Sequence, residues 1–369
     1  MFHSTFIRPF VRYSVVPSSK GDTFQGPSTP KLGRPIPGIS APRMMHDFGV
    51  SRKHTVIIDM PLTLNPFHLL WNKPVVDFDR QMPTRFGVFP RHEPDHVRWF
   101  ETEACCIFHT VNTWDEPAET AKGRFEAVNM LSCRMTSASI IYAVGNIPVP
   151  NGEQPLMEEE CRLYYHQFIV DGPNRGILNE WALSAIPFEF PHVPEAYSMS
   201  STRYVYGCST SRGSYQQQLQ DTMKIGSIVK VNVAELIARG MRKQPEAIHG
   251  CVDRRSVEEI IASEDPHDPI QIFAMPEGVY AQECVFIAKN RGETEDDGWL
   301  LTFVFDESQL GANECPNEDA FSELWIIDAR SMRTVVGKIK IPQRVPYGLH
   351  GNWFSKQDIE NQRGCAYTR

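Results

Sequence analysis

The sequence predicts an all-β fold on three observations. Short runs rich in Val, Ile, Phe and Tyr, each of the length of a strand, recur along the chain. Turn formers bound these runs, as in Pro-Asn-Gly at 150–152 and Asp-Asp-Gly at 296–298. Helical periodicity is rare, so the strands do not alternate with helices as they do in an α/β fold. A barrel, a sandwich and a propeller all satisfy this pattern, which does not choose among them.

The predicted elements follow one another with short connections. Strands are expected at 55–60, 85–89, 105–110, 137–144, 163–170, 204–207, 227–233, 279–287, 299–305, 324–328 and 334–341. Helices are expected over 233–242 and 254–263, where the apolar residues recur at helical spacing. The segment 16–41 is low in hydrophobic residues and rich in Ser, Pro and Gly, which predicts an exposed loop or hairpin connection. A propeller blade takes about 40–45 residues, so the chain could hold several blades.

Composition and charge exclude several classes of protein. The chain has 369 residues and a formal net charge of -8, without a basic tract, so we expect no nucleic-acid partner. No apolar run approaches the roughly 20 residues of a transmembrane helix. Arg8 and Arg12 interrupt the most apolar part of the N-terminus, which argues against a signal peptide. These observations favour a cytoplasmic protein.

The nine cysteines are an odd number and include no Cys-x-x-Cys pair. Zinc ribbons and disulfide frameworks need regular, close spacings, which are missing here. The cysteines are therefore expected to be buried free thiols.

Three histidines are candidate metal ligands. His46, His109 and His350 each lie where an apolar run meets a polar or glycine-containing turn. Neutral imidazole is a good ligand for Fe, Cu, Ni and Zn. Separations of 63 and 241 residues match no local metal motif, and a single histidine beside an apolar run is more often a packed core residue. Spacing alone therefore does not establish a metal site.

Longer motifs around these histidines resemble those of the carotenoid cleavage oxygenase family, especially its lignostilbene (stilbene-cleaving) dioxygenase branch. The resemblance extends from about Phe10 to Phe354. Around the three histidines, it is carried by His46-Asp47-Phe48 with 58–62, by 85–91, by 99–101 with Phe108-His109, Asn112 and 114–116, and by 347–354. Between them, it is carried by 188–191, 204–207, 283–286 and 295–298.

The resemblance implies a seven-bladed β-propeller with capping loops and few short helices, in which four histidines hold one Fe(II). Residues 1–369 would then form a single domain. By motif match, His46, His109 and His350 would be iron ligands, and Glu189 and Glu283 would accept hydrogen bonds from ligand rings. The candidate walls of an apolar substrate tunnel are Phe48, Phe108, Trp353 and Phe354.

The reaction implied by the resemblance is cleavage of a conjugated C=C bond by O2 to give two carbonyl products. The partners would be O2 and an apolar conjugated small molecule, either a stilbenoid or a carotenoid-derived compound. Loose contact with a membrane, from which such a substrate could be drawn, stays open.

Family chains carry a segment ahead of the point where this sequence starts, with the first iron histidine in a His-Pro-Lys motif and a further glutamate. The resemblance therefore predicts an N-terminally truncated propeller that lacks about two blades. His3, the only histidine upstream of His46, does not match that motif. Three hypotheses follow: an iron dioxygenase, an inactive truncated relative or gene-model fragment, and a non-catalytic binding propeller.

Overall fold

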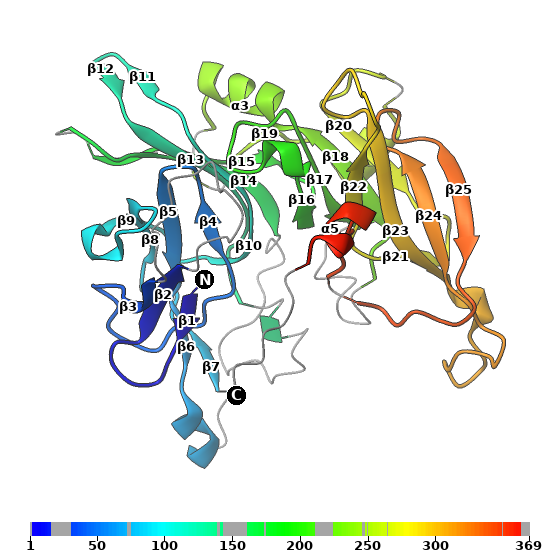
Figure 1. The fold of residues 1–369 in the computed structure, drawn as a ribbon, viewed down its shortest axis with the longest axis horizontal. Coiled ribbons are helices and arrows are strands. Elements are labelled where there is room, and N and C mark those ends of the chain that lie inside the picture. Colours follow the sequence, from blue (N-terminus) through cyan, green and yellow to red (C-terminus); the bar gives the residue numbers. More distant parts are fainter. Residues whose placement is uncertain are drawn as a thin grey trace.

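The computed structural model describes residues 2–15, 31–71, 75–138, 141–142, 161–172, 175–210, 224–245, 248, 250–263, 265–348 and 350–362. Within these residues, the four largest sheets begin one after another along the chain (Figure 1). A three-stranded sheet of β1 (Phe2–Ser4), β2 (Val11–Val15) and β3 (Lys31–Pro35) precedes them.

The first two large sheets form the N-terminal half of this arrangement. The first has the order β4 (Phe48–Val50), β5 (His54–Asp59), β8 (Thr84–Pro90) and β9 (Arg98–Thr102). The second has the order β10 (Cys106–Asp115), β13 (Ala127–Met135), β14 (Arg162–Ile169) and β15 (Gly176–Ser184), with β19 (Cys251–Asp253) added in parallel to β15. All other pairings in the two sheets are antiparallel.

The other two large sheets are also antiparallel. The third has the order β16 (Glu189–His192), β17 (Tyr204–Ser209), β18 (Ser227–Asn232) and β20 (Ile270–Ala274). In the fourth, β21 (Val279–Ala281) and β22 (Val285–Ala288) both pair with β23 (Gly298–Asp306), followed by β24 (Glu323–Asp328) and β25 (Val335–Lys340).

Short hairpins and helices complete the described structure. The hairpins are β6 (Leu62–Leu64) with β7 (Val76–Phe78), and β11 (Ala118–Thr120) with β12 (Gly123–Phe125). The helices are η1 (Pro66–Trp71), η2 (Pro94–His96), η3 (Glu195–Tyr197), α3 (Val233–Arg242), α4 (Val257–Ile261), η4 (Glu307–Gln309) and α5 (Lys356–Glu360).

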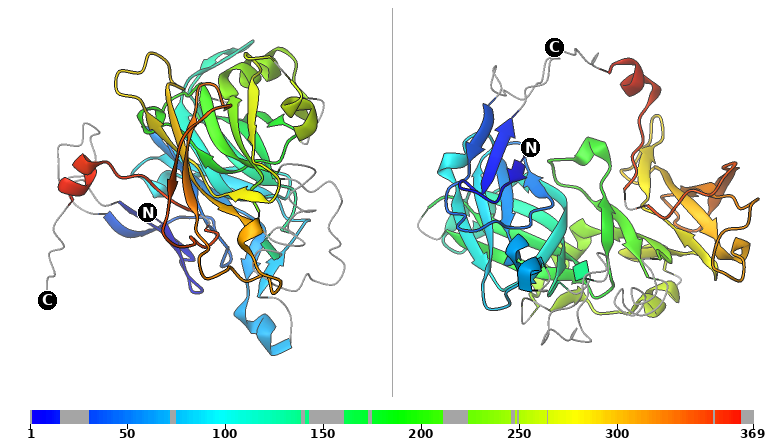
Figure 2. Two further views of the ribbon diagram at one scale, coloured as in Figure 1. Left: turned by 90° about the vertical axis from the view of Figure 1, so that its right-hand side faces the viewer. Right: turned by 90° about the horizontal axis from the view of Figure 1, so that it is seen from below.

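The four sheets lie around an arc, as propeller blades do, with the first strand of each sheet toward the inside (Figure 2). The inner strand β10 contacts β4 on one side and β16 on the other. One apolar cluster joins the first, second and third sheets, and a second joins the third and fourth sheets. The inner ends of successive sheets are therefore held close together.

Several predicted elements agree with the structure. The strands predicted at 55–60, 85–89 and 163–170 correspond to β5, β8 and β14. The helix predicted over 233–242 is α3, which begins there because the Asn232 side chain accepts a hydrogen bond from the Glu235 N–H. The helix predicted over 254–263 is the shorter α4, whose start is fixed by a capping box between Ser256 and Glu259.

Two strand predictions are wrong. The strand expected at 137–144 is not found in its described part, because Ser137 and Ala138 form a bend and residues 141–142 are helical. The strand in this region is instead β13, which the sequence analysis did not predict. All nine residues of β13 are buried, so its polar and apolar residues do not alternate as they do in a half-exposed strand. The single strand expected at 279–287 is divided into β21 and β22. The break between them contains Glu283.

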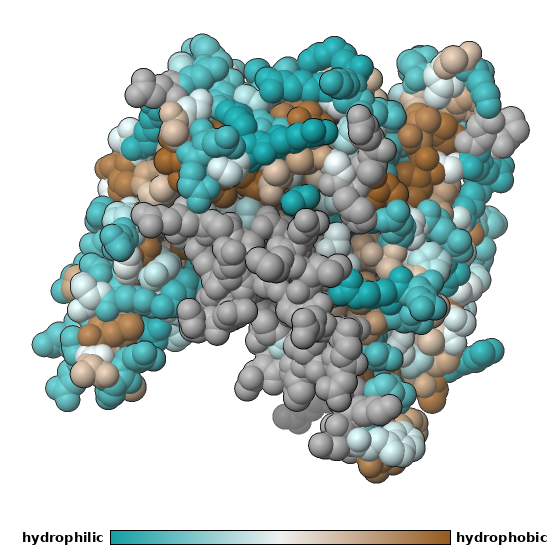
Figure 3. Space-filling model, turned by 180° about the vertical axis from the view of Figure 1, so that it is seen from behind, coloured by the Kyte–Doolittle hydropathy of each residue, from teal (hydrophilic) through white to brown (hydrophobic). Residues whose placement is uncertain are grey.

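The connection predicted at 16–41 is a hairpin in its described part, since β3 pairs antiparallel with β2. It is not wholly exposed, because Ile36 is 3% exposed and packs with Val11 and Ile57. Residues 16–30 lie outside the described residues. Seen from behind, the described surface is largely hydrophilic, with separate hydrophobic patches (Figure 3). None of the described helices has the length and apolar character to cross a membrane.

Candidate metal centre

The three candidate histidines converge from distant parts of the chain. His46 directly precedes Asp47 and β4, His109 lies in β10, and His350 lies in the C-terminal stretch beyond β25. Their ligand nitrogens all lie within 4.8 Å of one another. His109 Nε2 and His350 Nε2 are 3.2 Å apart, and the ring centroids of His46 and His109 are 5.2 Å apart.

A β-bulge directs His109 toward this cluster. The register between β10 and β13 shifts between Ile107 and Thr110, so Phe108 and His109 fall outside the regular pairing. Such a bulge turns side chains away from the ordinary alternation of a strand. The His109 ring can therefore face the inner side of the sheets.

A glutamate lies behind each of two rings. Glu189, at the start of β16, has its Oε2 2.6 Å from His109 Nδ1 and accepts a 2.9 Å hydrogen bond from the Phe190 N–H. Glu283, in the break between β21 and β22, has its Oε2 3.3 Å from His350 Nδ1 and accepts a 2.9 Å hydrogen bond from the Gly351 N–H. The two glutamates that the family resemblance implies thus each lie beside one of the candidate rings.

These carboxylates determine which ring nitrogen carries the proton. An ionised carboxylate only accepts, so the Nδ1 atoms of His109 and His350 donate, and in the neutral form of each ring Nε2 keeps a lone pair. Two such lone pairs 3.2 Å apart repel each other unless a proton or a metal ion lies between them. Two imidazole nitrogens bound at right angles to one metal, each at about 2.1 Å, would be about 3 Å apart. This donor set fits a transition-metal ion.

His46, which is exposed at the surface, and the half-buried His109 differ in their electrostatics. Partial desolvation lowers the pKa of His46, and the neighbouring His109 lowers it further. Burial also acts to lower the pKa of His109, but the hydrogen bond and charge of Glu189 outweigh it, so this pKa is raised. Among the described residues, no carboxylate is found to accept a hydrogen bond from the His46 ring.

The candidate tunnel aromatics are in different environments. The Phe108 ring is 4.9 Å from the His46 ring, between centroids, and is half-buried. Phe48 packs instead on Phe2, with the ring centroids 5.3 Å apart. Trp353 and Phe354 are 52% and 61% exposed.

Sequence reasoning missed Phe190. Its ring centroid is 5.7 Å from those of both His109 and His350. Its φ of 51° lies in the left-handed region, which is uncommon for a bulky residue and occurs more often at functional sites. The only signal in the sequence was its position directly after Glu189.

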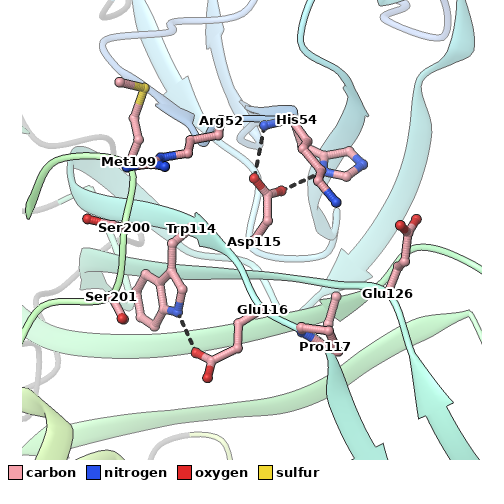
Figure 4. Close-up of a pocket in the computed structure, with 12 residues that line it drawn as sticks. Arg52, His54, Trp114, Asp115, Glu116, Pro117, Glu126, Met199, Ser200 and Ser201 are labelled. Carbon is pink, nitrogen blue, oxygen red and sulfur yellow. Dashed lines mark hydrogen bonds and ion pairs between the residues drawn. The ribbon is translucent and has the colours of Figure 1, made fainter. Parts of the chain in front are cut away.

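A separate pocket of 370 Å³ lies at the far end of β10 (Figure 4). It is lined by residues that include Arg52, His54, Trp114 and Asp115, and by none of the three candidate ligands. Asp115 accepts hydrogen bonds from His54 Nδ1 at 2.7 Å and from the Lys53 N–H at 2.9 Å. These hydrogen bonds hold the turn before β5 against the end of β10. The pairing of His54 with Asp115 is therefore explained by a role in the fold.

The retinal pigment epithelial membrane protein family model matches residues 1–355. The chain belongs to this family, the carotenoid oxygenases. It is 44% identical to the carotenoid dioxygenase carX of Gibberella fujikuroi, over all of this chain and 58% of that protein. It is 29% identical to carotenoid 9,10(9',10')-cleavage dioxygenase 1 of Phaseolus vulgaris, over 89% of this chain and 52% of that protein.

Solved structures of similar proteins confirm the propeller-type fold. Lignostilbene dioxygenase of Pseudomonas brassicacearum has a TM-score of 0.57 at 19% identity, over 84% of this chain and 54% of that one. Cobalt-substituted apocarotenoid oxygenase of Synechocystis has a TM-score of 0.58 at 17% identity, over 88% of this chain and 54% of that one. The carotenoid oxygenase chain described here thus spans about half the length of the relatives it matches.

Proposed function

We propose that this chain contributes three histidine ligands to the metal centre of a non-haem Fe(II)-dependent dioxygenase, which cleaves a conjugated C=C bond to give two carbonyl products. The observation that carries the proposal is the approach of His109 Nε2 to His350 Nε2 at 3.2 Å, each ring having a glutamate at its Nδ1. Four neutral ligands would leave the +2 charge of the ion to be offset by nearby carboxylates. Glu189 and Glu283 are placed to do so.

The residues of the site divide into ligands and supports. His46, His109 and His350 would hold Fe(II), which when bound supplies the site for activating O2. Glu189 and Glu283 keep the protons of two rings on Nδ1 and fix the ring orientation. Phe108 and Phe190 place apolar surface beside the histidines, where it would exclude water and receive an apolar polyene. Trp353 and Phe354, on the stretch that carries His350, are proposed as further contacts for the substrate.

A carotenoid or apocarotenoid substrate is favoured over a stilbenoid. The relative with 44% identity is named a carotenoid dioxygenase, and the lignostilbene dioxygenase is similar to this chain only at 19% identity. We also propose that residues 1–369 fold as one domain, because the two apolar clusters continue from each large sheet to the next. Peripheral contact with a membrane and a cytoplasmic location stay predictions.

The test is metal content followed by activity. The purified chain is reconstituted anaerobically with Fe(II), its iron is measured by elemental analysis, and it is incubated with an apocarotenoid and with resveratrol. We expect about one iron per chain and an aldehyde product from the apocarotenoid. His109→Ala is the control and should lose both. A soluble, folded sample with neither iron nor aldehyde would favour the inactive relative instead.

The binding-module hypothesis makes a different prediction. A propeller that only binds its ligand does not need a metal, so His46→Ala should leave apocarotenoid binding unchanged. Loss of metal together with loss of turnover in this variant would argue for the dioxygenase.

A further inference from the structure

The carboxylate of Glu189 has a third hydrogen-bond partner, which comes from another sheet. Glu189 Oε2 accepts hydrogen bonds from His109 and from the Phe190 N–H, while Oε1 accepts a 3.3 Å hydrogen bond from the Cys161 thiol. Cys161 directly precedes β14 in the second sheet, whereas Glu189 begins β16 in the third. The thiol therefore bridges two sheets behind the histidine cluster.

The backbone fixes the thiol in this position. The Cys161 carbonyl accepts a 2.8 Å hydrogen bond from the N–H of Phe188, the residue before Glu189. Cys161 is 0% exposed and Phe188 is 1% exposed, so neither can move without disturbing the core. The backbone contact and the thiol contact together define both the position and the rotation of the Glu189 carboxylate.

The thiol is the right donor for this carboxylate. Burial raises the pKa of Cys161 well above its ordinary value, and the neighbouring Cys133 and Glu189 raise it further, so the sulfur keeps its proton. An S–H group is a weak donor. It still matters here, because Glu189 is only 9% exposed and water has little access to its carboxylate. The Cys161 thiol donates to Oε1, the neighbouring Cys133 thiol also interacts with Cys161 and with this carboxylate, and an unpaired buried carboxylate oxygen is costly.

We propose that Cys161 is a positioning residue of the metal centre, which acts on His109 through Glu189. By occupying Oε1, the thiol leaves Oε2 to face His109 Nδ1 and keeps the ring proton on that nitrogen, so that Nε2 is free for the metal. Without the thiol, the carboxylate can rotate or take up the ring proton, and His109 loses its fixed orientation. The inference rests on the proposed metal centre and adds a residue to it that does not touch the ligands.

The experiment compares Co(II) binding by the wild-type chain and by three variants of Cys161. Cys161→Ala removes the donor, Cys161→Val removes the donor but fills the space, and Cys161→Ser keeps a donor. Affinity is measured by titration against a competing chelator, and the visible absorption of bound Co(II) reports the geometry of its ligands. Cys105→Ala is the matched control, because Cys105 is an equally buried thiol of the same apolar cluster, and no hydrogen bond joins it to Glu189 in the described part of the chain.

Loss of a direct hydrogen-bond partner of a metal ligand typically weakens metal binding 10- to 100-fold. Cys161 contacts such a partner and not the ligand itself, so we expect the Ala and Val variants to bind Co(II) only roughly 3- to 10-fold more weakly, with altered absorption bands. The Ser variant and Cys105→Ala should stay close to the wild type. Thermal melting identifies any variant that does not fold, in which case the other donor-free variant decides the question. Wild-type affinity and wild-type bands in a folded donor-free variant would overturn the role of Cys161. Failure of the wild-type chain to bind Co(II) would instead overturn the proposed metal centre.

Discussion

Asp47 accepts two hydrogen bonds from Thr110, one from its backbone N–H and one from its hydroxyl, both at 2.7 Å to Oδ2. Asp47 follows His46 in the sequence and Thr110 follows His109, so this carboxylate ties together the two segments that carry these histidines. Its other oxygen accepts a 2.7 Å hydrogen bond from the Phe48 N–H at the start of β4. The distance between the two imidazoles is thus set by side chains one residue away from them.

Removal of the Thr110 hydroxyl should loosen this connection. Thr110→Val keeps the backbone hydrogen bond but removes the other donor, which we expect to lower the free energy of unfolding by about 1–2 kcal/mol. Affinity for Co(II) should fall several-fold, because His46 and His109 would be less well placed. Chemical denaturation and metal titration measure the two effects. Thr110→Ser, which keeps the hydroxyl, is the control, and equal losses in both variants would contradict the connection.

The two glutamates should differ in their importance for metal binding. Glu189→Gln removes charge from a buried contact of 2.6 Å, and should weaken metal binding about 10- to 100-fold. Glu283→Gln alters a longer contact of 3.3 Å to His350, whose side chain is 50% exposed and more screened by water, so the loss should be smaller. Metal titration of both variants checks the order, with Glu101→Gln on the exposed side of β9 as a control. A larger loss in Glu283→Gln would show that the ranking by burial is wrong.

Much of the fold could be predicted from the sequence because strands depend on local pattern. Runs such as 163–170 combine β-branched and aromatic residues with flanking turn formers, and they appear as strands with nearly the predicted bounds. β13 was missed because a strand buried on both faces loses the alternation that reveals a strand. Arg134 and Ser132, both buried within it, obscured the pattern further.

The site was accessible mainly through the family resemblance. Convergence of His46, His109 and His350 depends on how sheets far apart in the sequence pack, which no local spacing encodes. The resemblance named these candidate ligands and both glutamates, and the structure brings each glutamate to one ring. It gave no indication of Cys161, whose contact with Glu189 exists only because two sheets meet there.

A buried ion pair should make stability depend on pH. Glu180 Oε1 is 2.5 Å from Arg134 Nη1, and Glu180 Oε2 accepts a 2.7 Å hydrogen bond from Thr102. Burial opposes ionisation, but His166, Arg134 and Thr102 outweigh it and lower the Glu180 pKa from 4.5 to about 2. A carboxyl group whose pKa is lower in the folded state than in the unfolded state stabilises the fold at pH values above its unfolded pKa. About 3 kcal/mol of stability that is present above pH 4.5 should therefore be lost as the pH falls to about 2.

Glu180→Gln tests this dependence. At pH 7 the variant should be about 3–5 kcal/mol less stable, because Arg134 would stay buried without its partner. The difference from the wild type should shrink as the pH falls from 4.5 to 2, where the wild-type carboxylate is itself protonated. Urea denaturation across this range measures the difference. A constant difference over the whole range would show that Glu180 does not titrate in this window.

Gly207 leaves room for the ring beside Glu189, and filling that room should disturb the site. A Cβ at this position in β17 would lie 2.4 Å from Phe188 Cζ, and Phe188 is 1% exposed. Gly207→Ala should therefore destabilise the chain by roughly 1–3 kcal/mol through overpacking. Because Phe188 directly precedes Glu189, its displacement should also weaken Co(II) binding. Gly176→Ala is the matched control, since a Cβ there would meet nothing within 4 Å. If both variants melt at the wild-type temperature and bind Co(II) equally well, the packing of Phe188 does not constrain Glu189.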